Sequence, residues 1–285
     1  MITLLEVLQK SATFLESKQV EHARLNAELL VGHALGLKRM QLYLEFERLL
    51  PEADLEKIRP LIRRRSQREP LQYIIGSVEF GGVELKVDKR ALIPRPETEY
   101  LVELLKEEFV AAGKEPGMVI DLGTGSGALA LALAQMWSSA KVYATDASEE
   151  ALALTTENCE ALELGGRVTV LQSDWFASVP ADERFDLIVA NPPYLTANEV
   201  EETSPEVKQF EPAMALSTAA DGMNAITTII EAAGSFLNAG GLLAMETGIA
   251  QHPQICKMLA AAGYTDVLSR PDLTGRDRFI FARKN

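Results

Sequence analysis

Apolar residues recur at a helical spacing along the N-terminal quarter of this 285-residue chain. In the first stretch these positions are Leu4, Leu5, Leu8, Ala12 and Leu15. The period predicts helices over residues 3–18 and 21–36, a shorter segment over 40–46, and a helix that Pro51 opens and that ends near Gln67. We therefore expect a small all-helical N-terminal domain over residues 1–72, in which no titratable cluster indicates chemistry.

The pattern changes between residues 73 and 90. Two strand-like runs there flank Gly81-Gly82, which is a hairpin signal, and we expect this hairpin to link two domains. Farther on, Pro94 and Pro96 bracket a single arginine, so the backbone should be extended before a helix begins near Pro96. This entry has two interpretations, an ordinary helix start or a stiff lid segment beside a cofactor. The lid would consist of Pro94, Arg95, Pro96 and Glu97.

From Gly117 onward, buried strand-like runs alternate with helical ones. The strand-like runs cover residues 118–123, 141–146, 167–174, 185–190 and 241–248. Alternation of this kind predicts a parallel sheet wound by right-handed crossovers. Two last runs, 264–272 and 277–284, can form a hairpin that places the final strand antiparallel at or near the sheet edge. The prediction is an α/β, Rossmann-like domain with seven strands over residues 91–285.

Composition and charge narrow the functional classes. The net charge is −13, but residues 1–80 carry about +1 and residues 81–285 about −14. A nucleic-acid substrate is disfavoured, because enzymes of DNA or RNA normally present a basic surface. No apolar run approaches the roughly 18 residues of a membrane span, and the N-terminus lacks the features of a signal peptide. With only Cys159 and Cys256, far apart, we expect a cytoplasmic protein without a metal site.

A glycine-rich segment joins the first strand of the predicted sheet to its first helix. It consists of Asp121, Leu122, Gly123, Thr124, Gly125, Ser126 and Gly127. The glycines allow a tight turn and close approach of a ligand to the helix N-terminus. GTGSGA formally fits a dinucleotide site, so an NAD-dependent dehydrogenase is one alternative. However, Asp121 would repel a pyrophosphate and suits the ammonium of a methionine moiety, which favours S-adenosylmethionine.

Three further residues stand at predicted strand ends, where open α/β sheets bind ligands. Asp146 ends the second strand and can accept hydrogen bonds from a ribose diol. Asp174 ends the third strand and can accept from an adenine amino group, while Trp175 can stack on the ring. The alternative for this pair is a strand-end turn with a half-buried tryptophan.

The run Phe185–Ala190 ends in Asn191, Pro192, Pro193 and Tyr194. Neither proline can donate a backbone hydrogen bond, so the sheet ladder stops there and the carbonyls are free to bind something else. Asn191 adds one acceptor and two donors, and Tyr194 adds a flat aromatic wall. The segment is typical of a recognition loop for a planar group that carries an NH2, although a rigid turn would have the same residues.

With these motifs the chain resembles the PrmC/HemK family of S-adenosylmethionine-dependent N5-glutamine methyltransferases, which act on class I peptide chain release factors. The resemblance covers nearly the whole chain. Its motifs are QYIIGSVEF (72–80), LIPRPETE (92–99), DLGTGSGALAL (121–131), SDWF (173–176), NPPY (191–194), EPAMAL (211–216), DGMNAI (221–226) and METGIAQ (245–251). The family's usual DGL reads Asp221-Gly222-Met223 here.

The resemblance implies S-adenosylmethionine as cofactor, S-adenosylhomocysteine as product, and the glutamine of a Gly-Gly-Gln tripeptide as substrate. It implies a catalytic group of Asn191, Pro192 and Tyr194, and a substrate-binding group that adds Pro193. The cofactor-binding residues would be Asp121, Gly123, Thr124, Gly125, Ser126, Gly127, Asp146, Asp174, Trp175 and Asn191. The N-terminal domain would recognise the substrate protein, and we expect a monomer.

Other functions remain open at this point. One is a glutamine methyltransferase of a large-subunit ribosomal protein, and a less favoured one is an adenine N6 methyltransferase. A non-catalytic S-adenosylmethionine sensor would have no use for the Asn-Pro-Pro-Tyr segment. Arg63, Arg64, Arg65 and Arg68 are interpreted as a solvated helix face, with a contact to an acidic partner or RNA as the alternative.

Overall fold

A computed structural model describes residues 2–217 and 222–285. The chain divides into two compact units. The first contains the residues up to Ser77 together with Ser204–Phe210, and the second contains Val78–Thr203 and Glu211–Asn285. A segment from the middle of the chain therefore belongs to the N-terminal unit, which the hydrophobic pattern did not predict.

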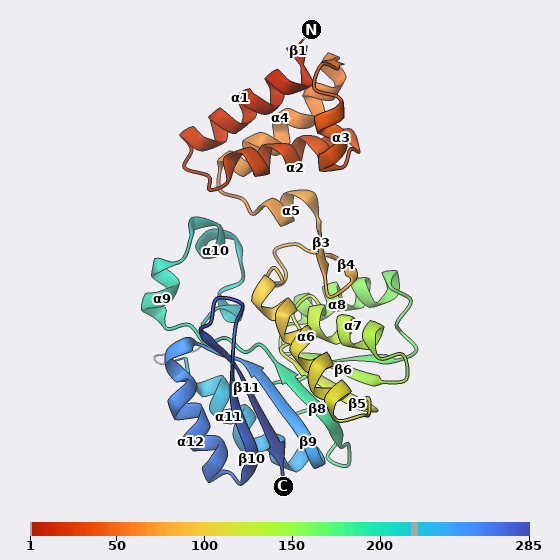
Figure 1. Ribbon diagram of the computed structural model, residues 1–285, viewed down its shortest axis with the longest axis vertical. Helices are drawn as coiled ribbons and strands as arrows, with labels where there is room; N and C mark the ends of the chain where they lie inside the picture. Colours follow the sequence, from red (N-terminus) through yellow and green to blue (C-terminus); the bar gives the residue numbers. More distant parts are fainter. Residues whose placement is uncertain (1, 218–221) are drawn as a thin grey trace. The chain divides into compact units, whose positions relative to one another are not determined.

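The first unit is helical (Figure 1). Its elements are β1 (Ile2–Thr3), α1 (Leu4–Ser17), α2 (Ala23–Leu35), α3 (Arg39–Leu44), β2 (Leu49–Leu50), α4 (Glu52–Ser66), α5 (Leu71–Ile75) and α10 (Pro205–Phe210). The predicted helices are confirmed, and Gly36 adopts the left-handed conformation (φ 66°) that ends α2. Thr3 and Glu6 form a capping box at the start of α1. The unit encloses its own core of buried residues, among them Leu4, Leu30 and Leu42.

The segment before the hairpin differs from the prediction. Residues 73–75 were expected to begin a strand, but they lie in the one-turn helix α5. Pro70 precedes this helix and Gly76, with φ 87°, ends it, so local backbone chemistry overrides the apolar, β-branched composition. The hairpin itself is present, with β3 (Ser77–Phe80) paired to β4 (Val83–Lys86) across the two glycines.

The interpretation of the arginine cluster as a solvated face is wrong for Arg65 and Arg68. Arg65 is buried and its Nη2 lies 2.7 Å from Glu206 Oε1, in α10 of the same unit. Arg68 binds both oxygens of the same carboxylate, at 2.8 and 2.6 Å. Arg65 also donates to Asn26 Oδ1 in α2, at 2.7 Å. The acidic contact of these two arginines therefore lies within the chain.

The second unit is built on a seven-stranded sheet in the order β10-β11-β9-β8-β5-β6-β7. The strands are β5 (Met118–Leu122), β6 (Lys141–Asp146), β7 (Val168–Gln172), β8 (Phe185–Ala190), β9 (Leu237–Glu246), β10 (Tyr264–Pro271) and β11 (Asp277–Lys284). Strands β9, β8, β5, β6 and β7 run parallel, whereas β11 is antiparallel to both neighbours. The final strand thus lies one place inside the edge, and the predicted α/β fold is confirmed.

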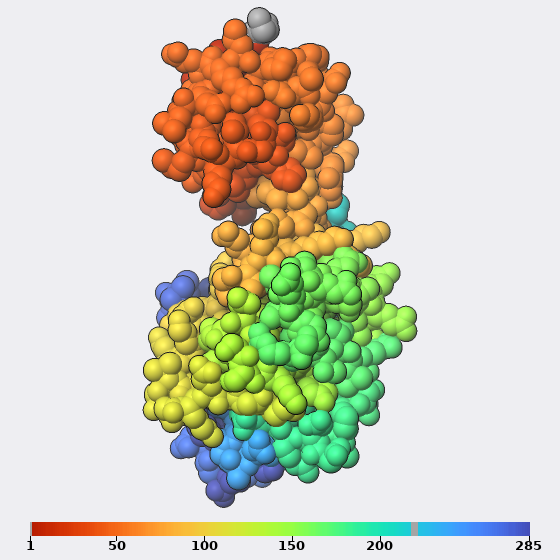
Figure 2. Space-filling model, turned by 90° about the vertical axis from the view of Figure 1, so that its right-hand side faces the viewer, coloured from red at the N-terminus to blue at the C-terminus, as the bar shows by residue number. Residues whose placement is uncertain are grey.

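Helices cover both faces of this sheet (Figure 1). They are α6 (Pro96–Ala111), α7 (Ala128–Met136), α8 (Glu149–Ala161), α11 (Asn224–Phe236) and α12 (His252–Ala261), with the shorter α9 (Ala197–Glu202), η1 (Ala213–Ala215) and η2 (Ile249–Gln251). Successive residues of β5 alternate between the faces: Val119 joins the core under α6 and α7, and Ile120 joins the core under α11 and α12. Figure 2 shows α6 in yellow beside α7 and α8 in green. Each buried aliphatic side chain contributes about 1.5–3 kcal/mol.

The strand register brings the carboxyl ends of the parallel strands to one edge of the sheet. Leu122 pairs with Ala190 and also with Thr145, and Ala190 pairs with Met245. The residue after Ala190 therefore stands between the glycine-rich loop that follows Leu122 and the last residue of β9. This edge holds the candidate site.

Candidate active site

The loop between β5 and α7 depends on glycines with positive φ at positions 123, 125 and 127. A Cβ at Gly127 would lie 2.9 Å from Leu131 Cδ1 and 3.1 Å from Thr155 Cγ2, so only glycine lets α7 and α8 approach here. A Cβ at Gly123 would lie 3.7 Å from Trp175 Cζ3. The indole thus lies close to the loop, within the site that the sequence predicted for a cofactor.

Asp121 is buried directly beneath this loop. Its Oδ2 accepts from the Thr124 hydroxyl at 2.6 Å and from the Ala130 backbone N–H at 3.1 Å. Its Oδ1 is buried and has no hydrogen-bond partner in the part of the chain that the structure describes. Burial raises the pKa of Asp121 to about 7. A buried carboxylate oxygen without a donor fits a cationic ligand group such as the ammonium of a methionine moiety.

Asp146 is held from both sides by the backbone. Gly125 N–H donates to its Oδ2 and Ser148 N–H to its Oδ1, each at 2.9 Å. The carboxylate is therefore fixed at the end of β6 with lone pairs remaining, which fits a ribose diol. The Thr155 hydroxyl, in α8, holds the Gly125 carbonyl at 2.8 Å.

We expect Asp146→Ala to weaken S-adenosylmethionine binding about 10- to 100-fold, because hydrogen bonds to a charged group are lost. Isothermal titration calorimetry measures the dissociation constant, and Asp182→Ala, at an exposed aspartate, is the control. A change of less than threefold in Asp146→Ala, with the melting temperature unaltered, would contradict this role.

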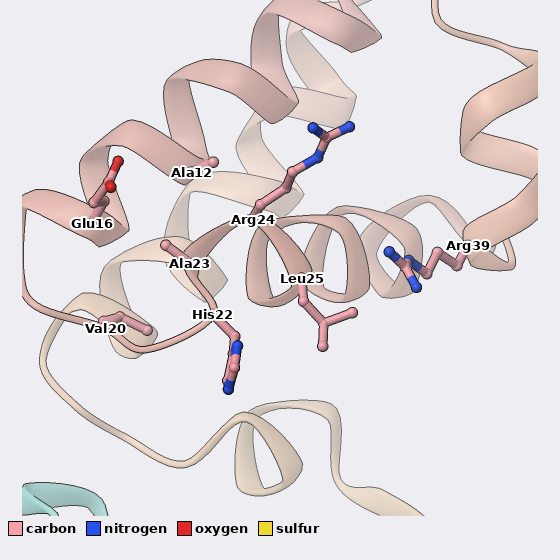
Figure 3. Close-up of a pocket in the computed structure, with 8 residues that line it drawn as sticks. All are labelled: Ala12, Glu16, Val20, His22, Ala23, Arg24, Leu25 and Arg39. Carbon is pink, nitrogen blue, oxygen red and sulfur yellow. The ribbon is translucent and has the colours of Figure 1, made fainter.

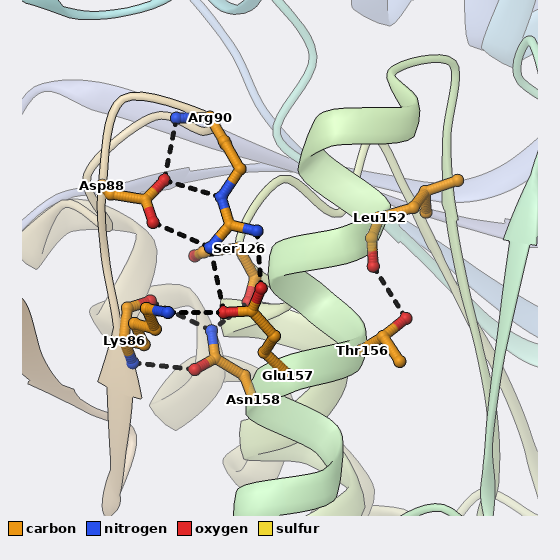
Figure 4. A network of polar contacts seen from close by, with 8 residues as sticks. All are labelled: Lys86, Asp88, Arg90, Ser126, Leu152, Thr156, Glu157 and Asn158. Atoms are coloured by element: carbon orange, nitrogen blue, oxygen red, sulfur yellow. Dashed lines mark hydrogen bonds and ion pairs between the residues drawn. The ribbon is translucent and has the colours of Figure 1, made fainter.

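A polar network links α8 to the hairpin and to the glycine-rich loop (Figure 4). Asn158 Nδ2 donates to the carbonyls of Lys86, at 3.0 Å, and Ser126, at 2.9 Å. Arg90 forms ion pairs with Asp88 and Glu157, at 2.8 and 2.7 Å. The sequence indicated none of the links made by Asn158 and Glu157, since their partners lie at least 32 residues away in the chain. The glycine-rich loop itself is held by the bond from Asn158 to Ser126.

β7 ends at Gln172, two residues earlier than predicted, and Asp174 and Trp175 in the turn after it are placed differently from one another. Asp174 is exposed at the sheet edge, whereas Trp175 is half-buried with φ 50°. The Ser173 hydroxyl stabilises the turn by donating to the Trp175 carbonyl at 2.8 Å. This arrangement leaves the Asp174 carboxylate open to solvent, and its role toward an adenine stays a prediction.

The Asn-Pro-Pro-Tyr segment follows β8 at the same edge. Asn191 Nδ2 donates to Thr98 Oγ1 at 2.9 Å, and the Tyr194 hydroxyl donates to Glu246 Oε1 at 3.0 Å. Thr98 in turn donates to Glu246 Oε2 at 2.6 Å. Sequence reasoning missed Thr98 and Glu246 as site residues, although both lie within the motifs LIPRPETE and METGIAQ.

Tyr194 is held on several sides. The Arg278 guanidinium lies over its ring, 5.8 Å from the centroid, and Gln251 Nε2 donates to its carbonyl at 3.2 Å. A Cβ on Gly222 would lie 2.2 Å from that carbonyl oxygen, so this position requires glycine. Burial raises the pKa of Tyr194, and the side chain is therefore a neutral phenol at neutral pH. Asp221, in the same motif as Gly222, lies outside the described residues.

The predicted lid segment is fastened at one point. Arg95 forms an ion pair with the buried Glu211 at 2.7 Å, and the Ile93 N–H donates to the same carboxylate at 3.3 Å. Glu97 lies in the first turn of α6, one residue before Thr98. The backbone is extended at Arg95 (φ −99°, ψ 147°) and α6 begins at Pro96, as predicted, whereas a movement of this segment as a lid stays a prediction.

The helical unit has a cavity of its own, with a volume of about 520 Å³ (Figure 3). Its lining residues come from α1, α2, α3 and the turn between α1 and α2: Ala12, Glu16, Val20, His22, Ala23, Arg24, Leu25 and Arg39. Leu25 is 38% exposed. The cavity therefore combines apolar side chains with Glu16 and with two arginines, both of which pair with Glu28 at 3.0 and 2.7 Å.

No group of three or more His, Cys, Asp or Glu side chains that could hold a metal ion occurs within residues 2–217 and 222–285. Both cysteines are free thiols. In the same described ranges, no helix has the length and apolar character needed to span a membrane.

Comparison with known proteins gives matches over both units. Residues 6–76 match the PrmC N-terminal domain model, and residues 96–209 match the methyltransferase small domain model. The release factor glutamine methyltransferase of Geobacter sulfurreducens is 40% identical over 281 residues, covering 99% of this chain and 96% of that protein. The protein of the same name from Deinococcus radiodurans is 39% identical over 282 residues, covering 99% and 98%.

Solved structures match the fold of the chain. A T. thermophilus 16S rRNA N2 methyltransferase in complex with AdoMet and guanosine has a TM-score of 0.53 at 23% identity, covering 73% of this chain and 50% of that one. The hMettl16 catalytic domain in complex with a MAT2A 3′UTR hairpin has a TM-score of 0.59 at 16% identity, covering 79% and 80%. At these identities the likeness extends to the methyltransferase fold alone.

Proposed function

The chain belongs to the release factor glutamine methyltransferase family, and on that premise we propose that it methylates the side-chain amide nitrogen (N5) of the glutamine in the Gly-Gly-Gln motif of class I peptide chain release factors. S-adenosylmethionine is the methyl donor. One observation of this chain carries the proposal: Asn191 uses its NH2 group on Thr98. Its carbonyl oxygen is therefore the atom left to accept a hydrogen bond from a substrate amide.

S-adenosylmethionine would be held by the glycine-rich loop with Asp121 and Asp146, where it supplies an electrophilic methyl group. The protein's own part is to orient the nucleophile. An amide nitrogen is a weak nucleophile because its lone pair is delocalised into the carbonyl. We assign the two acceptors for its N–H bonds to Asn191 Oδ1 and the Pro192 carbonyl, and the wall against the amide plane to Tyr194. Pro193 has no backbone N–H, so this segment cannot continue the hydrogen bonding between the strands.

Orientation of the nitrogen can supply about 7–11 kcal/mol in favourable systems. Acceptor dipoles also stabilise the positive charge that grows on the nitrogen during transfer. No strong base is required at the nitrogen, because its proton becomes acidic once the methyl group is attached. The half-buried Tyr194, kept neutral by its raised pKa, shields the amide from water without adding charge.

Mass spectrometry of a release factor after incubation with enzyme and S-adenosylmethionine tests this function. The expected result is a single methyl group on the glutamine of the Gly-Gly-Gln peptide. A large-subunit ribosomal protein and a DNA duplex, incubated in parallel, test the other methyltransferase readings. Methylation of one of these substrates instead of the release factor would contradict the proposal, and cofactor binding without any transfer would favour a sensor.

We also infer that the helical unit recognises the release factor as a folded protein, and that the enzyme acts as a cytoplasmic monomer. Its cavity presents Leu25, which is 38% exposed, among polar side chains, and this suits an apolar side chain of a protein partner. Size-exclusion chromatography with light scattering tests the monomer.

We expect Leu25→Asp to raise KM for the full-length release factor about tenfold, through the loss of apolar contact area, while KM for a short Gly-Gly-Gln peptide is unaltered. Steady-state kinetics with both substrates provide the measurement. Leu44→Asp, at an 85% exposed leucine of α3 outside the cavity, is the control. Equal effects of Leu25→Asp on protein and peptide would contradict recognition through this cavity.

A further inference from the structure

A buried carboxylate at the end of β9 connects the two side chains that the proposed function places against the substrate. Glu246 is 2% exposed. Its Oε1 accepts from the Tyr194 hydroxyl at 3.0 Å, and its Oε2 accepts from the Thr98 hydroxyl at 2.6 Å. Thr98, at the start of α6, is also buried and accepts from Asn191 Nδ2 at 2.9 Å. Three elements thus meet at one carboxylate.

The number of protons on each group determines which of Asn191, Thr98 and Glu246 donates in each hydrogen bond. A threonine hydroxyl has one proton, and a carboxylate has none to give. Because Thr98 donates its proton to Glu246, its oxygen can offer only lone pairs to Asn191. Asn191 must therefore turn its NH2 group toward Thr98 and its carbonyl oxygen away from it. Such networks set the orientation of an asparagine amide, and when Glu246 is ionised it fixes the Asn191 amide from two contacts away.

We propose that Glu246, acting through Thr98, is a positioning residue that fixes the Asn191 amide and thereby makes the site selective for a glutamine amide over a glutamate carboxylate. The inference rests on the proposed function. With Oδ1 toward the substrate, Asn191 accepts from an NH2 group and repels a carboxylate. With the amide reversed, Asn191 would donate, and the preference would change in favour of the carboxylate.

The charges around Glu246 make the network sensitive to pH. Burial raises the pKa of Glu246, and the nearby Glu97 raises it further. The hydroxyls of Thr98 and Tyr194 and the Arg278 guanidinium lower it, but the net shift is upward from 4.5. A protonated Glu246 can donate to Thr98, which frees the threonine proton to turn toward Asn191. The productive orientation is therefore present above the pKa of Glu246 and is lost as the pH falls through it.

The test compares Thr98→Val with Thr98→Ser in the full-length enzyme, using a Gly-Gly-Gln peptide as substrate and the matching Gly-Gly-Glu peptide as inhibitor. Valine keeps the shape of threonine but has no hydroxyl, and serine keeps the hydroxyl. We expect kcat to fall about 100-fold in Thr98→Val, which is the effect typical of losing a preorganised hydrogen-bonding group. Most of that activity should be recovered in Thr98→Ser. In the wild type we expect kcat to fall at acid pH as Glu246 is protonated, and this fall should be absent in Thr98→Val.

Glu246→Gln is the second variant. The NH2 group of the new glutamine can donate to Thr98, which can then donate its own proton to Asn191. We expect this variant to lower kcat and to tighten inhibition by the Gly-Gly-Glu peptide about tenfold relative to wild type, with the S-adenosylmethionine dissociation constant within threefold. Equal kcat in Thr98→Val and Thr98→Ser, or unaltered Gly-Gly-Glu inhibition in Glu246→Gln, would overturn this inference alone. A wild-type enzyme inactive on both the peptide and the release factor would overturn the proposed function instead.

Discussion

Asn191→Ala is expected to lower kcat for methylation of a Gly-Gly-Gln peptide at least about 100-fold, the effect typical of removing one preorganised hydrogen-bonding group at a reacting centre. The substitution removes the acceptor that orients the substrate nitrogen. It leaves Asp121, Asp146 and the glycine-rich loop in place, so binding of S-adenosylmethionine should survive. Methyl transfer from labelled cofactor and calorimetric binding to the same purified variant measure the two effects separately.

The control is Asn198→Ala, at an exposed asparagine in α9. Its kcat should equal that of the wild type. If Asn191→Ala retains activity within tenfold of the parent, the assignment of this side chain to the substrate amide is wrong.

Glu206→Ala is expected to destabilise the helical unit by about 3 kcal/mol, because it leaves the buried Arg65 and the half-buried Arg68 without their carboxylate. Arg65 and Arg68 have side chains only 7% and 18% exposed, and both bind Glu206. Amide hydrogen exchange in α4, compared with exchange in β5 of the other unit, measures the loss where it occurs. Glu202→Ala, at an exposed glutamate of α9, is the control.

The same carboxylate predicts a pH dependence. Burial acts to raise the pKa of Glu206, but the hydrogen bonds from Arg68 and Arg65 outweigh it, so its folded pKa lies below 4.5. Its contribution to stability is therefore present above pH 4.5 and is lost as the pH falls through the folded pKa. Protection of α4 should decline over that acid range in the wild type and decline less steeply there in Glu206→Ala, in which only other carboxylates such as Glu52 still titrate. A destabilisation below 1 kcal/mol would show that Arg65 and Arg68 are satisfied by other groups.

The parts of the site that could be predicted from sequence are those encoded by neighbouring residues. The glycine-rich loop, Asp146 and Asn191 each stand directly after an apolar run, and parallel strands bring such positions to one edge. Thr98 and Glu246 were missed as partners because 148 residues separate them and their meeting depends on β9 lying next to β8 and on the direction of α6. A hydrophobic pattern contains no information about such contacts.

The fold could likewise be predicted where neighbouring residues encode it. The prediction failed where other contacts or backbone conformation override the local hydrophobic pattern. Alternating strand and helix periods identified the sheet, including the antiparallel final strand. The one-turn helix α5 was missed because Pro70 and Gly76 decide its conformation against an apolar run that favours a strand. The membership of α10 in the helical unit depends on the pairing of Glu206 with Arg65 and Arg68, across at least 138 residues, which no local period reports.

Because Ser204–Phe210 belongs to the helical unit, that unit is not a separable N-terminal module. A chimaera that exchanges only residues 1–77 between relatives would pair the arginines of one parent with the α10 of the other. Such a transplant should succeed only where both parents have matching charges at positions 65, 68 and 206, or where the α10 segment is exchanged together with the N-terminal helices. The helical unit is thus discontinuous in sequence, and its exchange between relatives requires two separated segments of the chain.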